Sequence, residues 1–258
     1  MTHPTYEDTR QAWRDIWINT DFERELHTLS YHRSQHLISL YQPYLEKGVP
    51  LLEAGCGPAH VVHYFRQQGY DMIGLDYAPE ALIPTHHTHP DIPLHLGDVH
   101  HLPYASNQFG AYLSFGVVEH FEQGPIGALR EALRVLRPGG KLILTVPQPN
   151  FVEALRTVVN HLFPQRLAKL GQRAEYYETA YTHHQLVNFV SGVGFRVLRV
   201  EPYAHDFTFW GLHPIFRRND RYYETNELGE LAGSISRVVM PWWGAFECLV
   251  IAEKITAT

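Results

Sequence analysis

The sequence has few cysteines and no long apolar stretch. Its two cysteines, Cys56 and Cys248, lie far apart and show no CxxC spacing, which argues against a disulfide framework or a structural zinc site. The segment Met1 to Arg10 lacks the apolar core of a signal peptide, and no run approaches the ~18 apolar residues that a membrane span requires. We therefore expect a cytoplasmic protein without a membrane span.

Positive charge is not in excess either. The formal net charge is -6, so no global field attracts a phosphate backbone. Arg217, Arg218 and Arg221 are interrupted by Asp220 and followed by Glu224, which is typical of a solvated face. We expect a small-molecule substrate and no nucleic-acid partner. The sequence leaves the oligomeric state open, with a homodimer as one candidate.

Short apolar runs alternate with helix-period segments from Val49 to about Pro147. Because this alternation is typical of a parallel sheet with crossover helices, it predicts a doubly wound α/β fold. The strands that we expect span residues 49–54, 71–75, 93–96, 110–115, 141–146, 195–200 and 246–253. Ile126, Leu129, Leu133 and Leu136 recur at spacings of three and four, so they predict a helix with one stripe facing the sheet. Residues 137–140 are expected to end that helix in a turn.

Two regions do not follow this alternation. Residues 1–48 carry two apolar helical stripes, which predict an N-terminal helical cap packed on the core or over the site. Residues 149–181 and 203–241 leave the sheet after the fifth and sixth strands and are rich in aromatic side chains. We expect both to be lid segments of the main domain, residues 49–258, and their aromatic residues suggest an apolar or aromatic substrate.

A glycine-containing turn follows the first expected strand. Glu53 is followed by Gly55 and Gly57, and glycine lets the backbone turn sharply and approach a ligand closely. Ala59 and His60 stand where a dinucleotide fingerprint would have its last glycine. The turn alone is therefore also compatible with a plain tight turn.

Two carboxylates follow the next two strands. Asp76 ends the second strand, nineteen positions after Gly57 (76 minus 57), where a carboxylate can accept both hydrogen bonds of a ribose diol. Capping of the helix that starts near Ala78 is the alternative, and it does not exclude ribose binding. Asp98 follows the third strand, where an adenine amino group could be bound.

Together these stretches resemble the class I S-adenosylmethionine (SAM) dependent methyltransferases, especially the small-molecule enzymes with a methyltransferase-11-like domain. The stretches that carry the resemblance are LLEAGCGPA, IGLDYAPEAL, LGDVHHLPYASNQFGAYLSFGVVEHF and LRVLRPGGKLILTVP, in the expected order and spacing. The resemblance covers residues 48–148 closely and 182–201 loosely. It implies a seven-stranded, mostly parallel, Rossmann-like sheet whose last strand is antiparallel and inserted between strands five and six. It also implies SAM as cofactor and methyl transfer as activity.

The resemblance also assigns cofactor-binding positions. It implies that Glu53, Gly55 and Gly57 lie along the methionine part and ribose of SAM, and that Phe115 with Gly116 borders the sulfonium. Asp76, with its neighbour Tyr77, would hold the ribose hydroxyls, and Asp98 with the Val99 amide would bind adenine. Arg33, upstream of the first strand, could bind the SAM carboxylate as an arginine fork, although a salt bridge to Glu23 or Glu25 would suit it too. The cofactor-binding set is therefore Glu53, Gly55, Gly57, Asp76, Tyr77, Asp98, Val99, Phe115 and Arg33.

Catalysis makes modest demands, because the sulfonium is already activated and in-line positioning supplies most of the rate. A hydroxyl acceptor also needs a base within hydrogen-bond reach. Glu119 and His120 follow strand four and are the first candidates, with helix capping and packing under a lid as their structural alternatives. His184, beside His183, is the second, although an N-cap role for Thr182 explains this neighbourhood more simply.

A metal site is not predicted. The densest histidine group lacks a helical i, i+4 pair with an acidic partner, so we interpret its members as loop residues: His86, His87, His89, His95, His100 and His101.

Two other functions remain open from sequence. A nicotinamide-dependent oxidoreductase on a Rossmann sheet predicts an intact GxGxxG and does not account for Asp98 in its LGDVHHLP setting. A non-catalytic SAM-binding partner subunit predicts the same site without methyl transfer.

Overall fold

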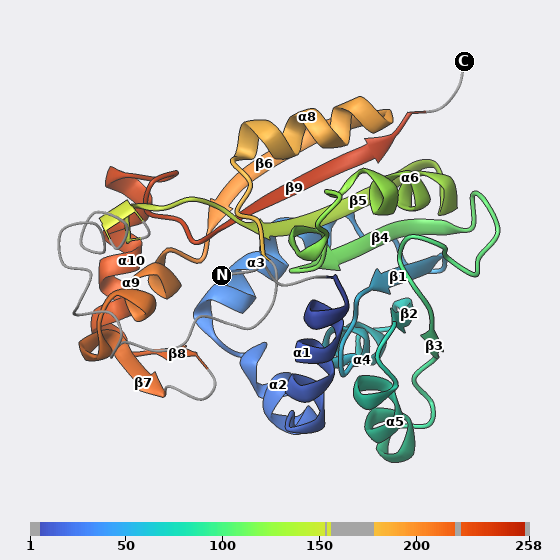
Figure 1. Cartoon of the computed structure of the whole chain (residues 1–258), viewed down its shortest axis with the longest axis horizontal. Coiled ribbons are helices and arrows are strands. Elements are labelled where there is room, and N and C mark those ends of the chain that lie inside the picture. The colour runs from blue at the N-terminus through green and yellow to red at the C-terminus, as the bar shows by residue number, and fades with distance from the viewer. Residues whose placement is uncertain (1–5, 153, 156–177, 220–222, 256–258) are drawn as a thin grey trace.

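The computed structural model describes residues 6–152, 154–155, 178–219 and 223–255. Figure 1 shows a twisted sheet flanked by helices, with a lobe of α9, α10, β7 and β8 beyond one end. The strands are β1 (Pro50–Ala54), β2 (Asp71–Asp76), β3 (Leu94–Leu96), β4 (Phe109–Phe115), β5 (Leu136–Pro147), β6 (Phe195–Tyr203), β7 (Arg217–Asn219), β8 (Glu224–Thr225) and β9 (Glu247–Lys254). The main helices are α1 (Tyr6–Ile18), α2 (Phe22–Thr28), α3 (His32–Tyr41), α4 (His60–Gln67), α5 (Pro79–Thr88), α6 (Ile126–Val135), α8 (His183–Val193), α9 (His205–Leu212) and α10 (Glu227–Val239).

The main sheet has seven strands in the order β3-β2-β1-β4-β5-β9-β6. β1 to β5 pair in parallel, and β9 runs antiparallel to both of its neighbours, β5 and β6. This confirms the predicted doubly wound sheet with the last strand inserted between strands five and six. Strand order reverses at β1 and β4, which in open α/β sheets is where ligands bind beyond the carboxyl ends.

One expected boundary is wrong. Residues 137–140 do not simply turn the chain back after the helix, because β5 begins at Leu136 and runs through them. The β4–β5 register shifts between Phe109 and Ala111, and this irregularity absorbs the extra residues before regular pairing resumes at Lys141.

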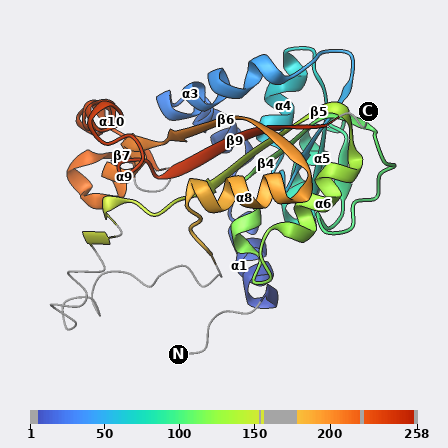
Figure 2. The same cartoon turned by 90° about the horizontal axis from the view of Figure 1, so that it is seen from above.

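Helices cover both faces of the sheet (Figure 2). One buried cluster joins the sheet to α6 and α8 through residues such as Leu129 and Leu186. The other joins it to α3, α4 and α5, through residues such as Tyr41 and Phe65. The helical periodicity that predicted these stripes is therefore satisfied by burial against the sheet.

Helix ends follow local chemistry. Thr182 caps α8 by accepting from the Gln185 amide while the Gln185 side chain accepts from the Thr182 amide, which forms a capping box. Gly194 then ends α8 with φ 116°, a conformation that glycine adopts at little cost. These signals place β6 directly after α8.

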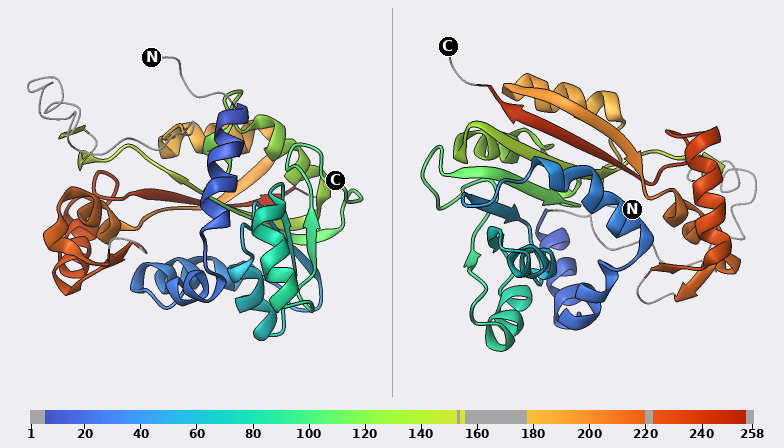
Figure 3. Two further views of the ribbon diagram at one scale, coloured as in Figure 1. Left: turned by 60° about the horizontal axis from the view of Figure 1, so that its bottom comes forward. Right: turned by 180° about the vertical axis from the view of Figure 1, so that it is seen from behind.

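The N-terminal helices lie beside the carboxyl ends of the strands. Figure 3 shows α1 and α2 between the α4–α5 side of the sheet and the C-terminal lobe. The lobe consists of α9, η4 (Pro214–Phe216), β7, β8 and α10 and corresponds to the expected segment 203–241. Most of the other expected lid, 149–181, lies outside the described residues, as do Asp220, Arg221 and Tyr222. No helix in the described part of the chain is long and apolar enough to cross a membrane.

Candidate active site

A cavity of about 190 Å³ lies at the carboxyl ends of β1, β2 and β4. We call it the first cavity. It brings together eight of the nine side chains or backbone positions predicted to bind the cofactor, together with one predicted catalytic residue. These are Glu53, Gly55, Gly57, Asp76, Tyr77, Asp98, Val99, Phe115 and His120.

The turn between β1 and α4 forms the floor of the first cavity. Gly55 and Gly57 have φ of 80° and 51°, so both need the freedom of glycine. A Cβ on Gly57 would stand 2.8 Å from the ring of Trp17, closer than any side chain tolerates. Ala59 also lies in the left-handed region, with φ 63°, where an alanine is strained. The sequence has alanine at the position where its resemblance expects glycine.

Asp76 anchors this turn. One carboxylate oxygen accepts from the Gly57 amide at 2.8 Å and the other from the Ala78 amide at 2.9 Å. Both readings of Asp76 from the sequence are thus compatible with the geometry, because the residue supports the turn and the start of α5 and also lines the first cavity. Burial raises the pKa of Asp76, and the backbone hydrogen bonds oppose that effect.

Asp98 is held by both the backbone amide and the side chain of His100. Its Oδ1 accepts from the His100 amide at 2.8 Å and lies 2.9 Å from His100 Nδ1. The hydrogen bond from the His100 side chain is the main reason that the pKa of Asp98 falls to about 2. Asp98 is therefore ionised at neutral pH. It follows β3 and lines the first cavity there.

Glu53 is buried at the end of β1, and its Oε2 has no hydrogen-bond partner among the described residues. Burial, and the nearby charge of Asp76, raise the pKa of Glu53 well above its usual value. Unsatisfied buried oxygens of this kind are costly unless a ligand supplies a donor. SAM carries its donors on an ammonium, two ribose hydroxyls and an adenine amine, so the three carboxyl groups of the first cavity fit it.

Helix α1 supplies a wall that the sequence did not assign residue by residue. Trp13 and Trp17 stack at 5.3 Å between ring centroids, and both line the first cavity with Arg10. The Arg10 guanidinium lies 4.9 Å from the centre of the Tyr77 ring. The apolar stripe of Trp13 and Trp17 was the available signal, since it predicted a helix over the core or the site.

A second cavity, of about 340 Å³, adjoins the first. The two share four wall residues at the end of β4 and the start of α4, namely His60, Val61, Phe115 and Gly116. The other walls of the second cavity come from α2 and α3, from the carboxyl ends of β5 and β6, from the first residue of β9 and from the residue before β8. They include Glu25, Arg33, Leu37, Tyr41, Thr145, Tyr203, Tyr223 and Glu247.

The three catalytic candidates predicted from the sequence, His120, Glu119 and His184, lie in different parts of the structure. His120 lines the first cavity, with its ring 5.2 Å from that of Trp13. Glu119 is buried, and its Oε1 lies 3.5 Å from the position that a Cβ on Gly116 would take. His184 lies on α8 against His183, and α8 packs on the opposite face of the sheet. The structure does not bring His184 to either cavity.

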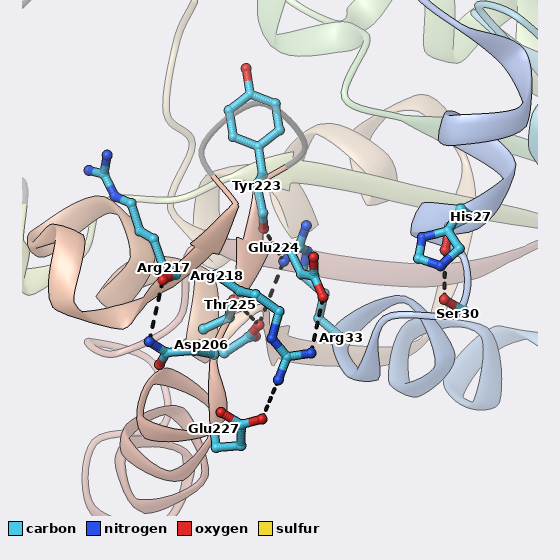
Figure 4. Close-up of polar contacts among 11 residues, drawn as sticks. His27, Ser30, Arg33, Asp206, Arg217, Arg218, Tyr223, Glu224, Thr225 and Glu227 are labelled. Carbon is cyan, nitrogen blue, oxygen red and sulfur yellow. Dashed lines mark hydrogen bonds and ion pairs between the residues drawn. The ribbon is translucent and has the colours of Figure 1, made fainter.

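Arg33 lies away from the first cavity. Figure 4 shows it reaching from α3 to the C-terminal lobe, where its Nη1 donates to the Tyr223 carbonyl at 2.7 Å and lies 3.7 Å from Asp206. Neither Glu23 nor Glu25 is its ion-pair partner, so the alternative considered from sequence is corrected to Asp206. The contact spans 190 positions along the chain and no local pattern could predict it.

No group of three or more His, Cys, Asp or Glu side chains in the described part of the chain is arranged to hold a metal ion. The two cysteines are both buried and unpaired by any disulfide. In Figure 4, Arg218 pairs with Glu224 and Glu227, which agrees with a solvated ion-pair network in place of a basic patch.

The sheet order, the glycine turn and the three carboxyl groups define a class I methyltransferase domain of the SAM-dependent type. The comparison with known families agrees, because residues 52–144 match the model of the methyltransferase domain. The likeness to this family therefore lies in residues 52–144.

Curated relatives include methyltransferases with partial sequence similarity to this chain. The chain is 32% identical to a demethylmenaquinone methyltransferase of Renibacterium salmoninarum over 53% of this chain and 57% of that protein. It is 34% identical to a malonyl-[acyl-carrier protein] O-methyltransferase of Pectobacterium atrosepticum over 36% of each. The chain thus spans little more than half the length of the first of these relatives and 36% of the second.

The fold extends further than the sequence similarity. A 1,6-didemethyltoxoflavin-N1-methyltransferase of Burkholderia thailandensis, solved with bound 1,6-didemethyltoxoflavin and S-adenosylhomocysteine (SAH), superposes with a TM-score of 0.62 at 13% identity. The match covers 99% of this chain and 93% of that chain. At this identity the likeness describes the fold.

Proposed function

We propose that this protein transfers the methyl group of SAM to a small-molecule acceptor. The observation that carries the proposal is the convergence of Glu53, Asp76 and Asp98 on one cavity at the ends of neighbouring strands. Bound SAM would supply a methyl group already activated by its sulfonium. The protein's part is then to hold donor and acceptor in line and to exclude water.

The cofactor roles follow the geometry of the first cavity. Asp76 binds the ribose hydroxyls, and Asp98 with the Val99 amide binds adenine. Glu53 and the Gly55–Gly57 turn hold the methionine part, and Phe115 borders the sulfonium. Arg10 replaces Arg33 in this proposal, because Arg10 lines the first cavity and Arg33 does not.

The N-terminal segment 1–48 acts as a cap in this proposal, and the lobe at 203–241 as a lid. Trp13 and Trp17 of α1 cover the first cavity, while Tyr223 of the lobe reaches the second. Apolar residues of the second cavity, such as Leu37 and Tyr41, suit an acceptor with an apolar or aromatic body. Other lobe aromatics pack on one another, as Phe207 does on Trp210, and Phe207 also contacts Phe246 outside the lobe.

Calorimetry with SAM, SAH and NADH tests the cofactor. We expect heat from SAM and SAH and none from NADH, and the reverse result would contradict the proposal in favour of an oxidoreductase. Methyl-labelled SAM is then incubated with the low-molecular-weight fraction of a cell extract. Labelled product is the expected result, while SAH binding without any labelled product would favour the non-catalytic partner subunit.

A further inference from the structure

The second cavity contains a carboxylate that the roles assigned above do not use. Glu247 begins β9, and its Oε2 accepts a hydrogen bond from the Tyr203 hydroxyl at the end of β6. Tyr203 and Glu247 are directly paired across these two antiparallel strands. The register of β6 with β9 therefore fixes the position of the pair.

The position of this pair relates it to the methyl donor. Thr145, Tyr203 and Glu247 line the second cavity, and the wall that it shares with the first cavity includes Phe115 and Gly116. Phe115 is the residue that borders the sulfonium in the proposed function. A molecule in the second cavity would thus meet the methyl group on one side and Glu247 on another.

We infer that the second cavity binds the methyl acceptor, that the acceptor carries a hydroxyl group, and that Glu247 accepts the proton of this hydroxyl. This inference rests on the proposed function. In the step, the acceptor oxygen attacks the methyl carbon and forms the new carbon–oxygen bond. The carbon–sulfur bond breaks, its electron pair stays on sulfur, and the hydroxyl proton passes to the Glu247 carboxylate.

Glu247 is better suited to this task than the neighbouring Glu119. Burial raises the pKa of Glu247, whereas the hydrogen bond from Tyr203 and the charge of Arg33 oppose that rise. Burial raises the pKa of Glu119 well above its usual value, and Glu247 adds to that rise through its charge. Glu247 also lines the second cavity, whereas Glu119 lines neither cavity. Position therefore favours Glu247 as the base.

A hydroxyl acceptor explains why a base is placed here. An alcohol or phenol must lose its proton as the new bond forms, whereas a neutral amine attacks without help. A carboxylate acceptor would meet the negative charges of Glu25 and Glu247 in the same cavity, with the charge of Arg33 already paired to Asp206. The acceptor class is therefore an uncharged hydroxyl compound with an apolar body.

The first test uses Glu247→Gln on the labelled reaction with the low-molecular-weight extract fraction. We expect an O-methylated product from wild-type protein and a loss of rate in Glu247→Gln of roughly 100- to 10,000-fold, the range for one general base. SAH affinity, measured by calorimetry, stays unchanged. Glu253→Gln is the matched control, since it lies on the same strand but pairs with Lys141 and Arg196 away from both cavities.

The second test uses Tyr203→Phe, which keeps the ring but removes the hydrogen bond to Glu247. Because that bond lowers the pKa of Glu247, the rising limb of kcat/KM against pH moves to higher pH. The other titratable groups around Glu247 are Glu119, Arg33, Glu25, Tyr41, His60, Tyr223 and Cys248. They are unchanged in the variant, so the shift reports the pair alone.

The outcomes separate the inference from the proposed function. An N-, S- or C-methylated product, or equal rates for Glu247→Gln and wild type, would overturn the inference while leaving methyl transfer intact. A pH profile that Tyr203→Phe does not shift would also overturn it. SAH binding without any labelled product would refute the proposed function itself, and the inference with it.

Discussion

The two cavities differ in how their polar groups are brought together. In the first cavity, Glu53 and Asp76 stand at the ends of neighbouring strands, and Asp98 follows the next strand along the chain. In the second, Tyr203 and Glu247 are 44 positions apart, and Arg33 contacts a carbonyl 190 positions away. Local strand-and-turn patterns thus specify the first cavity, whereas tertiary contacts specify the second.

The largest effect that we expect from this comparison is a loss of SAH affinity on substitution of Asp76. Asp76→Ala removes a carboxylate that would accept two hydrogen bonds from ribose, each worth about 1.5 kcal/mol when one partner is charged. SAH binding should therefore weaken roughly 100-fold in calorimetry. Asp71→Ala is the matched control, because Asp71 is the exposed first residue of the same strand and pairs with Arg66. Equal affinity of the two variants would remove Asp76 from the cofactor site.

The next largest effect is expected at Arg33. It should change the local stability of the C-terminal lobe and leave the first cavity unchanged. Arg33→Ala removes the donor to the Tyr223 carbonyl and the partner of Asp206. A hydrogen bond to a charged group contributes about 2 kcal/mol, so hydrogen exchange in α9, β8 and α10 should increase. SAH affinity should not change. A clear loss of SAH affinity would restore the role that the sequence suggested, as the partner of the SAM carboxylate.

Much of the main sheet and of the first cavity could be predicted from the sequence, for a physical reason. Parallel strands with crossover helices leave apolar runs at regular intervals, and the residue after each strand reaches one shared edge. The same logic could not place Arg33, since nothing near it in the sequence indicates Asp206. Nor could it place Glu247 beside Tyr203, because that pairing depends on the register of β9 with β6.

A smaller effect is expected at Ala59, where this chain departs from the pattern that it resembles. Ala59 has φ 63° and ψ 29° at the start of α4, and a left-handed conformation costs an alanine roughly 1–2 kcal/mol. Ala59→Gly should relieve that strain but also loosen the unfolded chain. We therefore expect a net gain of about 1 kcal/mol in urea unfolding. A loss of stability would mean that packing of the Ala59 methyl group stabilises the fold by more than the backbone strain at Ala59 destabilises it.

The smallest effect concerns the Asp98–His100 pair of the first cavity. The pKa of Asp98 is lowered to about 2 in the folded protein, chiefly by the hydrogen bond from His100. A carboxyl group whose pKa is lower in the folded than in the unfolded protein stabilises the fold at pH values above its unfolded pKa of about 3.9. That contribution is lost as the pH falls through the folded-state pKa. Wild type should therefore lose more stability than Asp98→Asn as pH falls from about 4 to about 2.

The size of this difference is limited by solvent. The Asp98 side chain is 36% exposed and that of His100 is 26% exposed, so the pair resembles a surface ion pair, worth about half a kcal/mol. Urea unfolding of both variants across this pH range measures it. Parallel losses in wild type and Asp98→Asn would mean that His100 does not hold Asp98, which would leave this carboxylate oriented by the His100 backbone amide alone.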